Sequence, residues 1–327
     1  MKPPYEITNK ILSLYGQITE ALGICQSILL VKPEAKLRKQ NRIKTIHSSL
    51  AIEGNTLNLE HVTALIENSH VVGPKKDILE VQNAIKVYDQ LKEFNPKQLK
   101  DFLKAHHVLM NGLVENPGKF RRSQVGIIKG KQVAHIEPGF DMVPGLMYDL
   151  FEYLKKDTDP DLIKSCVFHY EMEFIHPFED GNGRMGRYWQ TRLLMNVNPI
   201  FEFVPIEKVI KDNQEEYYKL LEVSDNTGST TIFIEFMLDI INKSLRETIS
   251  ESTPTTSNYA KRIEYALSQL NDWFDRKEYL SICKGISTAT ASRDIKQLLK
   301  DGLIESKGSG RMMKYRKKKE WLITAST

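Results

Sequence analysis

The segment from His176 to Arg187, HPFEDGNGRMGR, constrains the fold of this 327-residue chain more than any other feature. Two amphipathic segments flank it, the first ending near Ile175 and the second starting near Met185. The glycines between them allow only a tight loop, so the sequence predicts a helix, a loop and a second helix. Small residues let the backbone amides of such a loop approach an anion. The following helix adds free N–H groups and the positive end of its dipole.

Polyphosphate is the ligand that suits this loop best. Arg184 and Arg187 lie three residues apart on one helical face and add positive charge. Asp180 precedes the loop amides, where a carboxylate can hold a Mg²⁺ ion that bridges phosphate oxygens. Histidine is the side chain best suited to accept a proton near neutral pH, so His176 is the candidate general base.

Two other motifs share these letters. Residues 181–186 match the Gly-x-Gly-x-x-Gly fingerprint of dinucleotide sites, but that fingerprint follows a β-strand and the preceding segment has helical spacing. The loop also resembles the start of an EF-hand, yet the fifth, sixth and twelfth positions hold Arg184, Met185 and Thr191. The remaining alternative is a structural His176 with surface arginines, which leaves the combination of residues unexplained.

Length and composition predict a soluble chain of about two domains. The hydrophobic content of 41% and charged content of 27% are ordinary for globular proteins, and no apolar run is long enough for a membrane span. The first ten residues do not resemble a secretory signal, so we expect a cytoplasmic protein without a membrane partner. Cys25, Cys166 and Cys283 lie far apart and indicate buried thiols.

Helical spacing of apolar residues predicts a mainly α fold. Residues 251–258, ESTPTTSN, contain no apolar side chain and have the composition of a linker. We therefore expect an N-terminal helical region at 1–95, a domain at 96–250 and a second domain at 259–327. Within the larger domain, residues 125–135 contain two short β-favouring runs around Lys129-Gly130-Lys131, which predicts a β-hairpin on a helical body.

After the linker, the pattern predicts helices at 259–274, 277–283 and 291–299, followed by two strands around Lys307-Gly308-Ser309-Gly310. This order resembles a winged helix-turn-helix domain. The candidate contacts to DNA are Ser292, Arg293, Lys296 and Arg311. Winged helices also dock on proteins, so both kinds of partner stay open.

The same central segment resembles the Fic family, whose signature HPFx(D/E)GNGRxxR it matches at every specified position. Gly118-Lys119-Phe120-Arg121, Val143-Pro144 and the stretch from Glu216 to Met237 are also similar to this family, so the resemblance covers about 48–241. It implies a helical Fic-type domain with a β-hairpin flap. It also implies a protein adenylyltransferase, which transfers AMP from ATP to a Ser, Thr or Tyr hydroxyl of a target protein; this chain itself is one candidate target.

The resemblance implies a role for each matched residue. His176 would deprotonate the target hydroxyl, which attacks the α-phosphorus of ATP, and Asp180 would hold the Mg²⁺ cofactor. Arg184 would bind the β-phosphate and Arg187 the γ-phosphate, while Asn182 and the loop amides would bind the α- and β-phosphates. The other candidate ATP contacts are Phe178, Gly181, Gly183, Tyr217 and Tyr218.

The predicted hairpin gains a role from the same resemblance. In this family the hairpin resembles a flap that pairs with an extended stretch of the target as an added strand. Val133 and His135 are then the candidate docking residues. A purely structural ribbon that covers the core is the alternative.

Ser49 and Glu53 lie four residues apart with helical spacing, so they share a face. Gly54-Asn55 predicts that the helix ends there. A glutamate in the last turn opposes the helix dipole by about 0.3–1 kcal/mol unless a cation compensates, which hints at an arginine partner. These residues resemble the inhibitory motif (S/T)xxxE(G/N) of the family, whose glutamate pairs with the second motif arginine, here Arg187. We therefore expect Glu53 to block the γ-phosphate position and to autoinhibit the enzyme.

Two other functions use the same residues. In a de-AMPylase, Glu53 would orient a water molecule that removes AMP from a modified protein. In a DNA-binding regulator, the Fic-like domain would only sense nucleotide.

Overall fold

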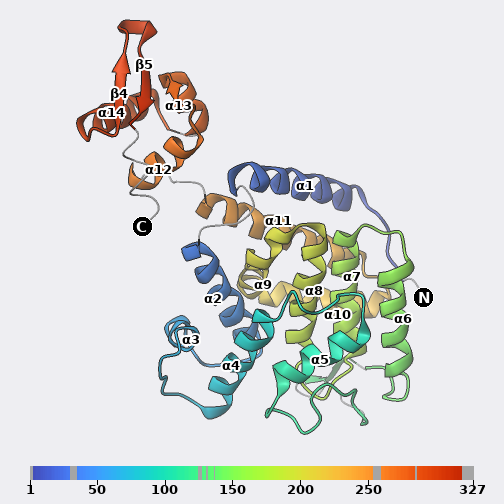
Figure 1. The fold of residues 1–327 in the computed structure, drawn as a ribbon. Helices are drawn as coiled ribbons and strands as arrows, with labels where there is room; N and C mark the ends of the chain where they lie inside the picture. The colour runs from blue at the N-terminus through green and yellow to red at the C-terminus, as the bar shows by residue number, and fades with distance from the viewer. Residues whose placement is uncertain are drawn as a thin grey trace. The chain divides into compact units, whose positions relative to one another are not determined.

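The computed structural model describes residues 3–29, 35–123, 127–129, 132–135, 137–252, 259–283 and 286–318 (Figure 1). The helices are α1 (Asn9–Leu29), α2 (Ala35–Ile52), α3 (Leu59–Ile66), α4 (Lys75–Asp89), α5 (Leu99–Met110), α6 (Val143–Lys156), α7 (Asp161–Ile175), α8 (Asn182–Val197), α9 (Ile206–Asp212), α10 (Gln214–Thr227), α11 (Thr231–Ser252), α12 (Tyr259–Gln269), α13 (Arg276–Ile282) and α14 (Thr288–Lys300). The strands are β1 (Ile127–Lys129), β2 (Gln132–His135), β3 (Trp273–Phe274), β4 (Ile304–Lys307) and β5 (Lys314–Lys317). The mainly α fold class is confirmed.

The chain divides into two compact units, residues 1–249 and 250–327. The division predicted near residue 95 does not coincide with a boundary between compact units, because one apolar core extends from Ile11 to Leu245. Glu251 and Ser252 end α11 instead of starting the predicted linker, and the rest of that linker, residues 253–258, lies outside the described residues. No helix in the described ranges is both long and apolar enough to cross a membrane.

Helices α7 and α8 form the centre of the first unit and pack against each other (Figure 1). The apolar stripe of a surface helix would cover one face, but α7 is buried on almost every side, including Lys164 and His169. Such polar side chains are tolerated because they are bonded: His169 Nδ1 lies 2.7 Å from Gln190 Oε1 of α8. Burial on all sides makes this pair of helices a rigid support for the loop that joins them.

Aromatic side chains fill the space between α8 and its neighbours. Phe102 of α5 stacks on Phe178 at 5.5 Å and meets the edge of Trp189 at 5.1 Å between ring centroids. Phe151 of α6 and Phe168 of α7 complete the cluster. Phe178 belongs to the central motif, so this cluster anchors the loop to the core.

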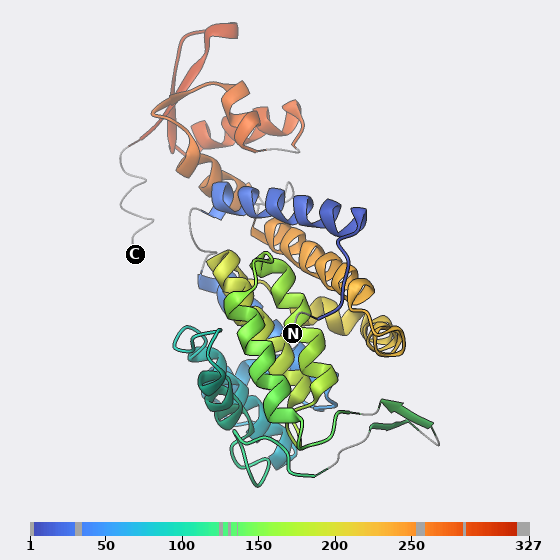
Figure 2. The same ribbon diagram turned by 90° about the vertical axis from the view of Figure 1, so that its right-hand side faces the viewer.

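The N-terminal helices join the same core. Helix α1 runs beside α11 (Figure 2), where Asn242 Nδ2 donates to Gln17 Oε1 at 2.9 Å. Helix α2 packs on α9, and Asn41 Nδ2 donates to the Phe203 carbonyl at 2.8 Å. Glu53 follows the last residue of α2, and this packing brings it to the start of α8.

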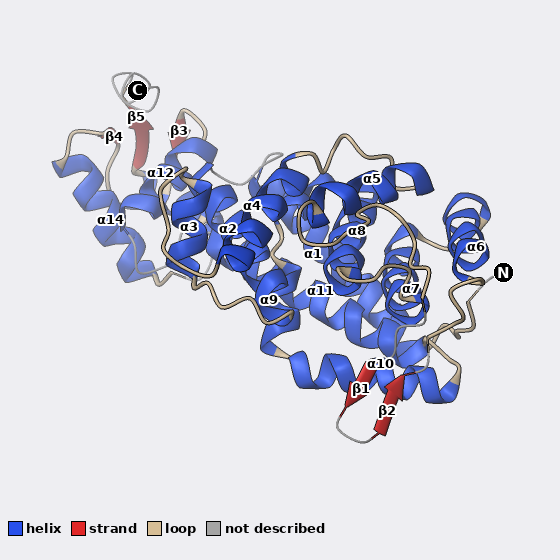
Figure 3. Cartoon of the chain, turned by 90° about the horizontal axis from the view of Figure 1, so that it is seen from below, coloured by secondary structure: helices blue, strands red, loops and turns tan. Residues whose placement is uncertain are grey.

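The predicted hairpin is present as β1 and β2, which pair antiparallel with a register irregularity between Ile127 and Ile128. It projects from the helices (Figure 2), and β2 lies beside α10 (Figure 3). Val125, Gly130 and Lys131 lie outside the described residues.

The second unit has its own core, which includes Leu267, Phe274 and Leu298. Its strands pair antiparallel in the order β3-β5-β4. One helix was predicted over 259–274, but α12 ends at Gln269 and Trp273–Phe274 form β3. Asp275 follows β3 directly and starts the next helix, capping α13 through a reciprocal capping box with Glu278. The described order of helices and ribbon otherwise follows the pattern in the sequence, and the winged-helix assignment stays a prediction.

Candidate active site

The loop between α7 and α8 carries the central motif. Helix α7 ends at His176, which adopts the left-handed conformation with φ 48° and ψ 60°. Helix α8 begins at Asn182, after Gly181 with φ 86°. A side chain at Gly181 would be strained by this φ, and its Cβ would lie 2.7 Å from Met110 Sδ. The predicted arrangement of helix, tight loop and helix is therefore present.

Asn182 locks this loop. Its side-chain oxygen accepts from the Phe178 N–H at 2.9 Å, and its side-chain nitrogen donates to the Phe178 carbonyl at 2.9 Å. The Asn182 amide is thus engaged within the loop, so a phosphate would meet its backbone N–H. The side chain of Phe178 is fully buried, and its backbone N–H and carbonyl both bond Asn182, so Phe178 anchors the loop rather than offering a free donor to a nucleotide.

Arg121 fixes the backbone of the candidate base. Its buried guanidinium donates through Nε to the His176 carbonyl at 2.7 Å and through Nη2 to the Pro138 carbonyl at 2.6 Å. Nη1 donates to the Ser123 carbonyl at 3.2 Å. Ser123 precedes the hairpin and Pro138 follows it, so one cation ties both ends of the hairpin to His176.

His106 supports the loop from α5. The Gly118 N–H can only donate, so His106 Nδ1, at 2.8 Å, is the acceptor and Nε2 carries the proton. Nε2 then donates to the Asp180 carbonyl at 3.0 Å. Burial lowers the pKa of His106 from 6.5 to about 4, which keeps this ring neutral. It stacks on Phe178 with ring centroids 3.5 Å apart.

Arg184 lies between two carboxylates and is only 4% exposed. Nη1 donates to Glu80 Oε1 at 3.0 Å, and Nη2 donates to Asp180 Oδ1 at 2.8 Å. Glu80 is itself held by Asn55 Nδ2 at 2.8 Å. Arg184 is therefore a fixed, buried cation, which the alternative of surface arginines does not explain.

Arg187 contacts the end of α2 and is 1% exposed. Its Nη2 donates to Glu53 Oε1 at 2.7 Å and to the Ser49 carbonyl at 3.0 Å, and its Nε lies 3.3 Å from Ser49 Oγ. Burial would lower the pKa of Arg187, but the carboxylates of Glu53 and Glu173 outweigh burial and raise the pKa above its ordinary value. The ion pair expected from the sequence is thus present in the structure.

Glu53 also lies against the start of α8. A Cβ at Gly183 would overlap Glu53 Oε1 and would lie 3.0 Å from Arg187 Nη1. The first N–H groups of an α-helix have no acceptor within the helix and favour an anion. The Glu53 carboxylate therefore occupies the position at which this helix start favours negative charge.

A cavity of about 390 Å³ opens in front of the loop, within the range of small-molecule sites. Its lining consists of Glu53, Glu173, Phe174, His176, Glu179, Asp180, Gly181, Asn182, Gly183, Arg187, Tyr217, Tyr218, Leu221, Glu222 and Asp225. The Tyr217 hydroxyl lies 3.0 Å from His169 Nε2 and 3.3 Å from Glu173 Oε1, and burial raises its pKa well above the ordinary value. Tyr217 is thus a fixed, uncharged wall, whereas Tyr218 is 38% exposed at the rim.

Asp180 offers the cavity a carboxylate beside the loop amides, and its side chain is 45% exposed. Among the described residues, no group of three or more His, Cys, Asp or Glu could enclose a metal ion. Mg²⁺ commonly binds through one or two carboxylates, water and substrate phosphates instead of a full protein cage. The donor set therefore fits Mg²⁺ that arrives with a polyphosphate.

The structure brings together almost all the residues predicted for ATP, the metal and inhibition. Val133 and His135 lie in β2, but their side chains are outside the described residues. Sequence reasoning assigned no role to Glu80, His106, Glu173 or Arg121. Of these, only Arg121 carried a signal, because it lies in the GKFR stretch that resembles the Fic family.

Comparison with known proteins gives matches over the same region. Residues 96–194 match the family model described as the Fic/DOC family. The chain is 28% identical over 221 residues to the protein adenylyltransferase Fic of Drosophila willistoni, a match that covers 64% of this chain and 42% of that protein. The Drosophila mojavensis protein of the same name is 29% identical with the same coverage. This chain thus spans less than half the length of these curated relatives.

Solved structures extend the likeness. A Fic family protein from Desulfovibrio desulfuricans is 37% identical with a TM-score of 0.75, and the match covers 98% of this chain and 99% of that one. Fic-1 from C. elegans is 20% identical with a TM-score of 0.61 over 73% of each chain, which shows a shared fold alone.

Proposed function

Because the chain belongs to the Fic/DOC family, we propose that it is a protein adenylyltransferase held in an inhibited state by Glu53. The observation that carries the proposal is the contact between Glu53 and Arg187, 2.7 Å long, in the lining of the cavity beside the start of α8. In this contact Arg187, the residue expected to bind a phosphate, pairs with the Glu53 carboxylate, which lies where the helix start favours an anion. The name of the Drosophila relatives, protein adenylyltransferase Fic, supports the same reaction class.

His176 takes the proton of a target Ser, Thr or Tyr hydroxyl in this proposal. The hydroxyl oxygen forms a bond to the α-phosphorus of ATP, and the bond from that phosphorus to the pyrophosphate oxygen breaks. Arg121 holds the His176 carbonyl, so the imidazole leaves α7 from a fixed backbone position. Mg²⁺, held by Asp180, supplies charge neutralisation to the phosphates when it is bound.

The loop supplies the rest of the phosphate site. The N–H groups at the start of α8 face the α- and β-phosphates, and Arg184, fixed by Glu80 and Asp180, supplies positive charge near the β-phosphate. The γ-phosphate would pair with Arg187. It needs the position that the Glu53 carboxylate holds, so ATP in its productive pose and Glu53 exclude each other.

The test is incubation of the wild type, Glu53→Gly and His176→Asn with α-labelled ATP, Mg²⁺ and a cell lysate. We expect strong labelling of protein with Glu53→Gly, weak labelling with the wild type and none with a variant that carries both substitutions. Asparagine tolerates the left-handed backbone of residue 176, so loss of activity would not reflect strain. Labelling by the double variant would eliminate His176 as the base.

A further inference from the structure

The second unit carries the positive charge of the chain. Residues 250–327 contain 15 Lys and Arg against nine Asp and Glu, a net charge of +6, whereas residues 1–249 contain 31 against 33, a net charge of −2. A domain with this excess attracts polyanions if its cations gather on one face.

Helix α14 presents a cationic face. Its buried side includes Ala291, Ile295 and Leu298, and its exposed side carries Arg293 and Lys296. Exposed Ala289, Ser292 and Lys300 complete the same face. No acidic residue lies on this face, and within the described ranges none of its three cations forms an ion pair.

The remaining charges near α14 leave that face positive. Arg276 Nη1, from the start of α13, lies 3.3 Å from Ser292 Oγ and adds a cation. Asp301, just after the helix, accepts from Gln297 Nε2 at 2.6 Å, and Glu278 caps α13. Asp294 points to the opposite side, where its carboxylate pairs with Arg262 at 2.6 and 2.7 Å.

That buried ion pair fixes the orientation of the helix. Arg262 lies on α12, and Tyr279 of α13 places its hydroxyl 3.1 Å from Asp294 Oδ2. Three helices thus meet at one buried carboxylate, which holds α14 with its cationic face outward. A preorganised face of this kind loses little conformational entropy on binding.

The ribbon of β4 and β5 also presents exposed positive charge, independently of α14. Lys307 and Lys314 are directly opposite each other in the antiparallel register, and both are exposed. Like charges at opposite positions destabilise a ribbon, so fold stability does not account for them. In contrast, Glu305 and Arg316, the opposing pair two residues further along, neutralise each other at 2.5 Å.

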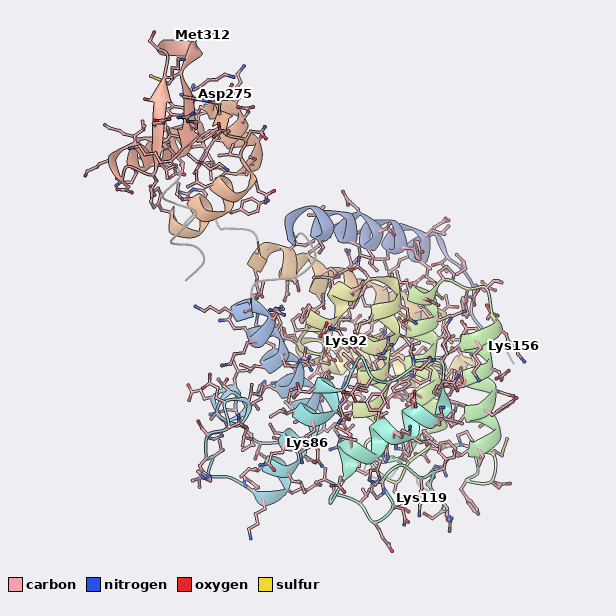
Figure 4. All side chains as sticks on the ribbon, viewed as in Figure 1. Lys86, Lys92, Lys119, Lys156, Asp275 and Met312 are labelled. Atoms are coloured by element: carbon pink, nitrogen blue, oxygen red, sulfur yellow. The ribbon has the colours of Figure 1, made fainter. Side chains whose placement is uncertain are left out.

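We propose that the second unit docks on double-stranded DNA, with α14 in the major groove and Lys307 and Lys314 of the ribbon on the phosphate backbone. The major groove of B-DNA is wide enough for an α-helix, whereas that of double-stranded RNA is not. A protein partner is disfavoured because the large apolar side chains exposed in the described part of this unit are Leu299 and Met312, which do not make a patch. Met312, 81% exposed, lies at the tip of the ribbon (Figure 4).

Fluorescence anisotropy of the full chain with a labelled mixed-sequence duplex of about 30 base pairs tests this assignment through its salt dependence. We expect Arg293→Ala/Lys296→Ala to weaken binding at least about tenfold and to lower the slope of log K against log salt by about 1–2. Lys307→Ala/Lys314→Ala, in the ribbon, should lower the slope similarly. Lys75→Ala/Lys76→Ala removes two exposed cations from the first unit and is the matched control, expected to leave binding within about twofold.

The alternatives have distinct outcomes. The assignment would be overturned if the wild type did not bind the duplex at low salt, or if both second-unit variants bound it as tightly as the wild type. It would also be overturned if the control variant lost as much affinity as the second-unit variants. Equal or tighter binding of a duplex RNA of the same length would overturn the major-groove geometry. The folding of each variant is checked by circular dichroism. Because His176→Asn should bind DNA like the wild type, this test is independent of the proposed transfer of AMP.

Discussion

Replacing Glu53 with glycine removes the carboxylate that pairs with Arg187 and should raise the rate of AMP transfer. The bond is charged, 2.7 Å long, and has one wholly buried partner and one 30% exposed partner. A charged hydrogen bond of this kind contributes about 1.5–3 kcal/mol net. If productive ATP must displace it, each 1.4 kcal/mol corresponds to a factor of ten, so we expect a gain of about 10- to 150-fold at subsaturating ATP.

The same substitution should raise the rate of AMP transfer but lower the stability of the fold. Without nucleotide, Arg187 stays buried beside Ser49 and loses its nearest anion, so the free energy of unfolding should fall by about 1–3 kcal/mol. With Mg²⁺ and ATP, the variant should gain more thermal stability than the wild type, because tenfold tighter binding adds about 1.4 kcal/mol at saturation.

The assays are initial rates of labelling with α-labelled ATP and thermal unfolding with and without Mg²⁺ and ATP. Glu179→Gly is the matched control, because Glu179 lines the same cavity, is exposed and forms no ion pair within the described residues. Glu53→Gln keeps the size of the side chain and should give an intermediate gain. The inhibitory role would be refuted if Glu53→Gly and the wild type had equal labelling rates and if ATP raised their melting temperatures equally.

Three further predictions concern the candidate base and the residues that support its loop. Arg121→Lys should lower the rate constant for transfer by about 10- to 100-fold with less effect on the KM for ATP, since lysine cannot bond the His176, Ser123 and Pro138 carbonyls together; an unchanged rate constant would contradict the clamp. His176→Asn should abolish transfer and change the melting temperature by less than about 3 °C, as differential scanning fluorimetry can check. Burial lowers the pKa of His106 from 6.5 to about 4, so as the pH falls the ring is protonated in the unfolded chain at a higher pH than in the folded chain. Stability from this group is complete above about pH 6.5 and is lost as the pH falls toward 4, by at most about 3 kcal/mol. Urea unfolding across this range should show a smaller loss for His106→Gln than for the wild type.

Local chemistry made much of the site predictable. The glycines on either side of Asn182, the flanking helical spacing and the helix stop after Glu53 depend on neighbours in sequence, so their patterns predicted the loop and the end of α2. The hairpin followed from the same kind of signal. The single helix predicted over 259–274 was wrong because the cap at Asp275 and the pairing of Trp273 with Arg316 favour a strand there.

Partners that are remote in sequence could not be predicted from local patterns. Glu80 and His106 reach the loop from separate helices, and nothing in their own neighbourhoods indicates a contact with Arg184 or Asp180. Arg121 lies in a stretch that resembles the Fic family, but that stretch does not show that its side chain bonds the His176 carbonyl. Asn182, assigned to phosphate, instead bonds the Phe178 backbone within its own loop.

The sequence by itself determined the kind of chemistry: an anion-binding loop at the start of a helix, a candidate base and a glutamate at the end of another helix. The resemblance to the Fic family predicted that this glutamate meets Arg187, but only the tertiary structure decided the geometry of that contact and that Arg184 and Arg187 are buried rather than exposed. The physical reason is that helix spacing fixes which side chains share a face. Which faces meet depends instead on packing of the whole core, and here that packing places α2 and α5 beside the loop.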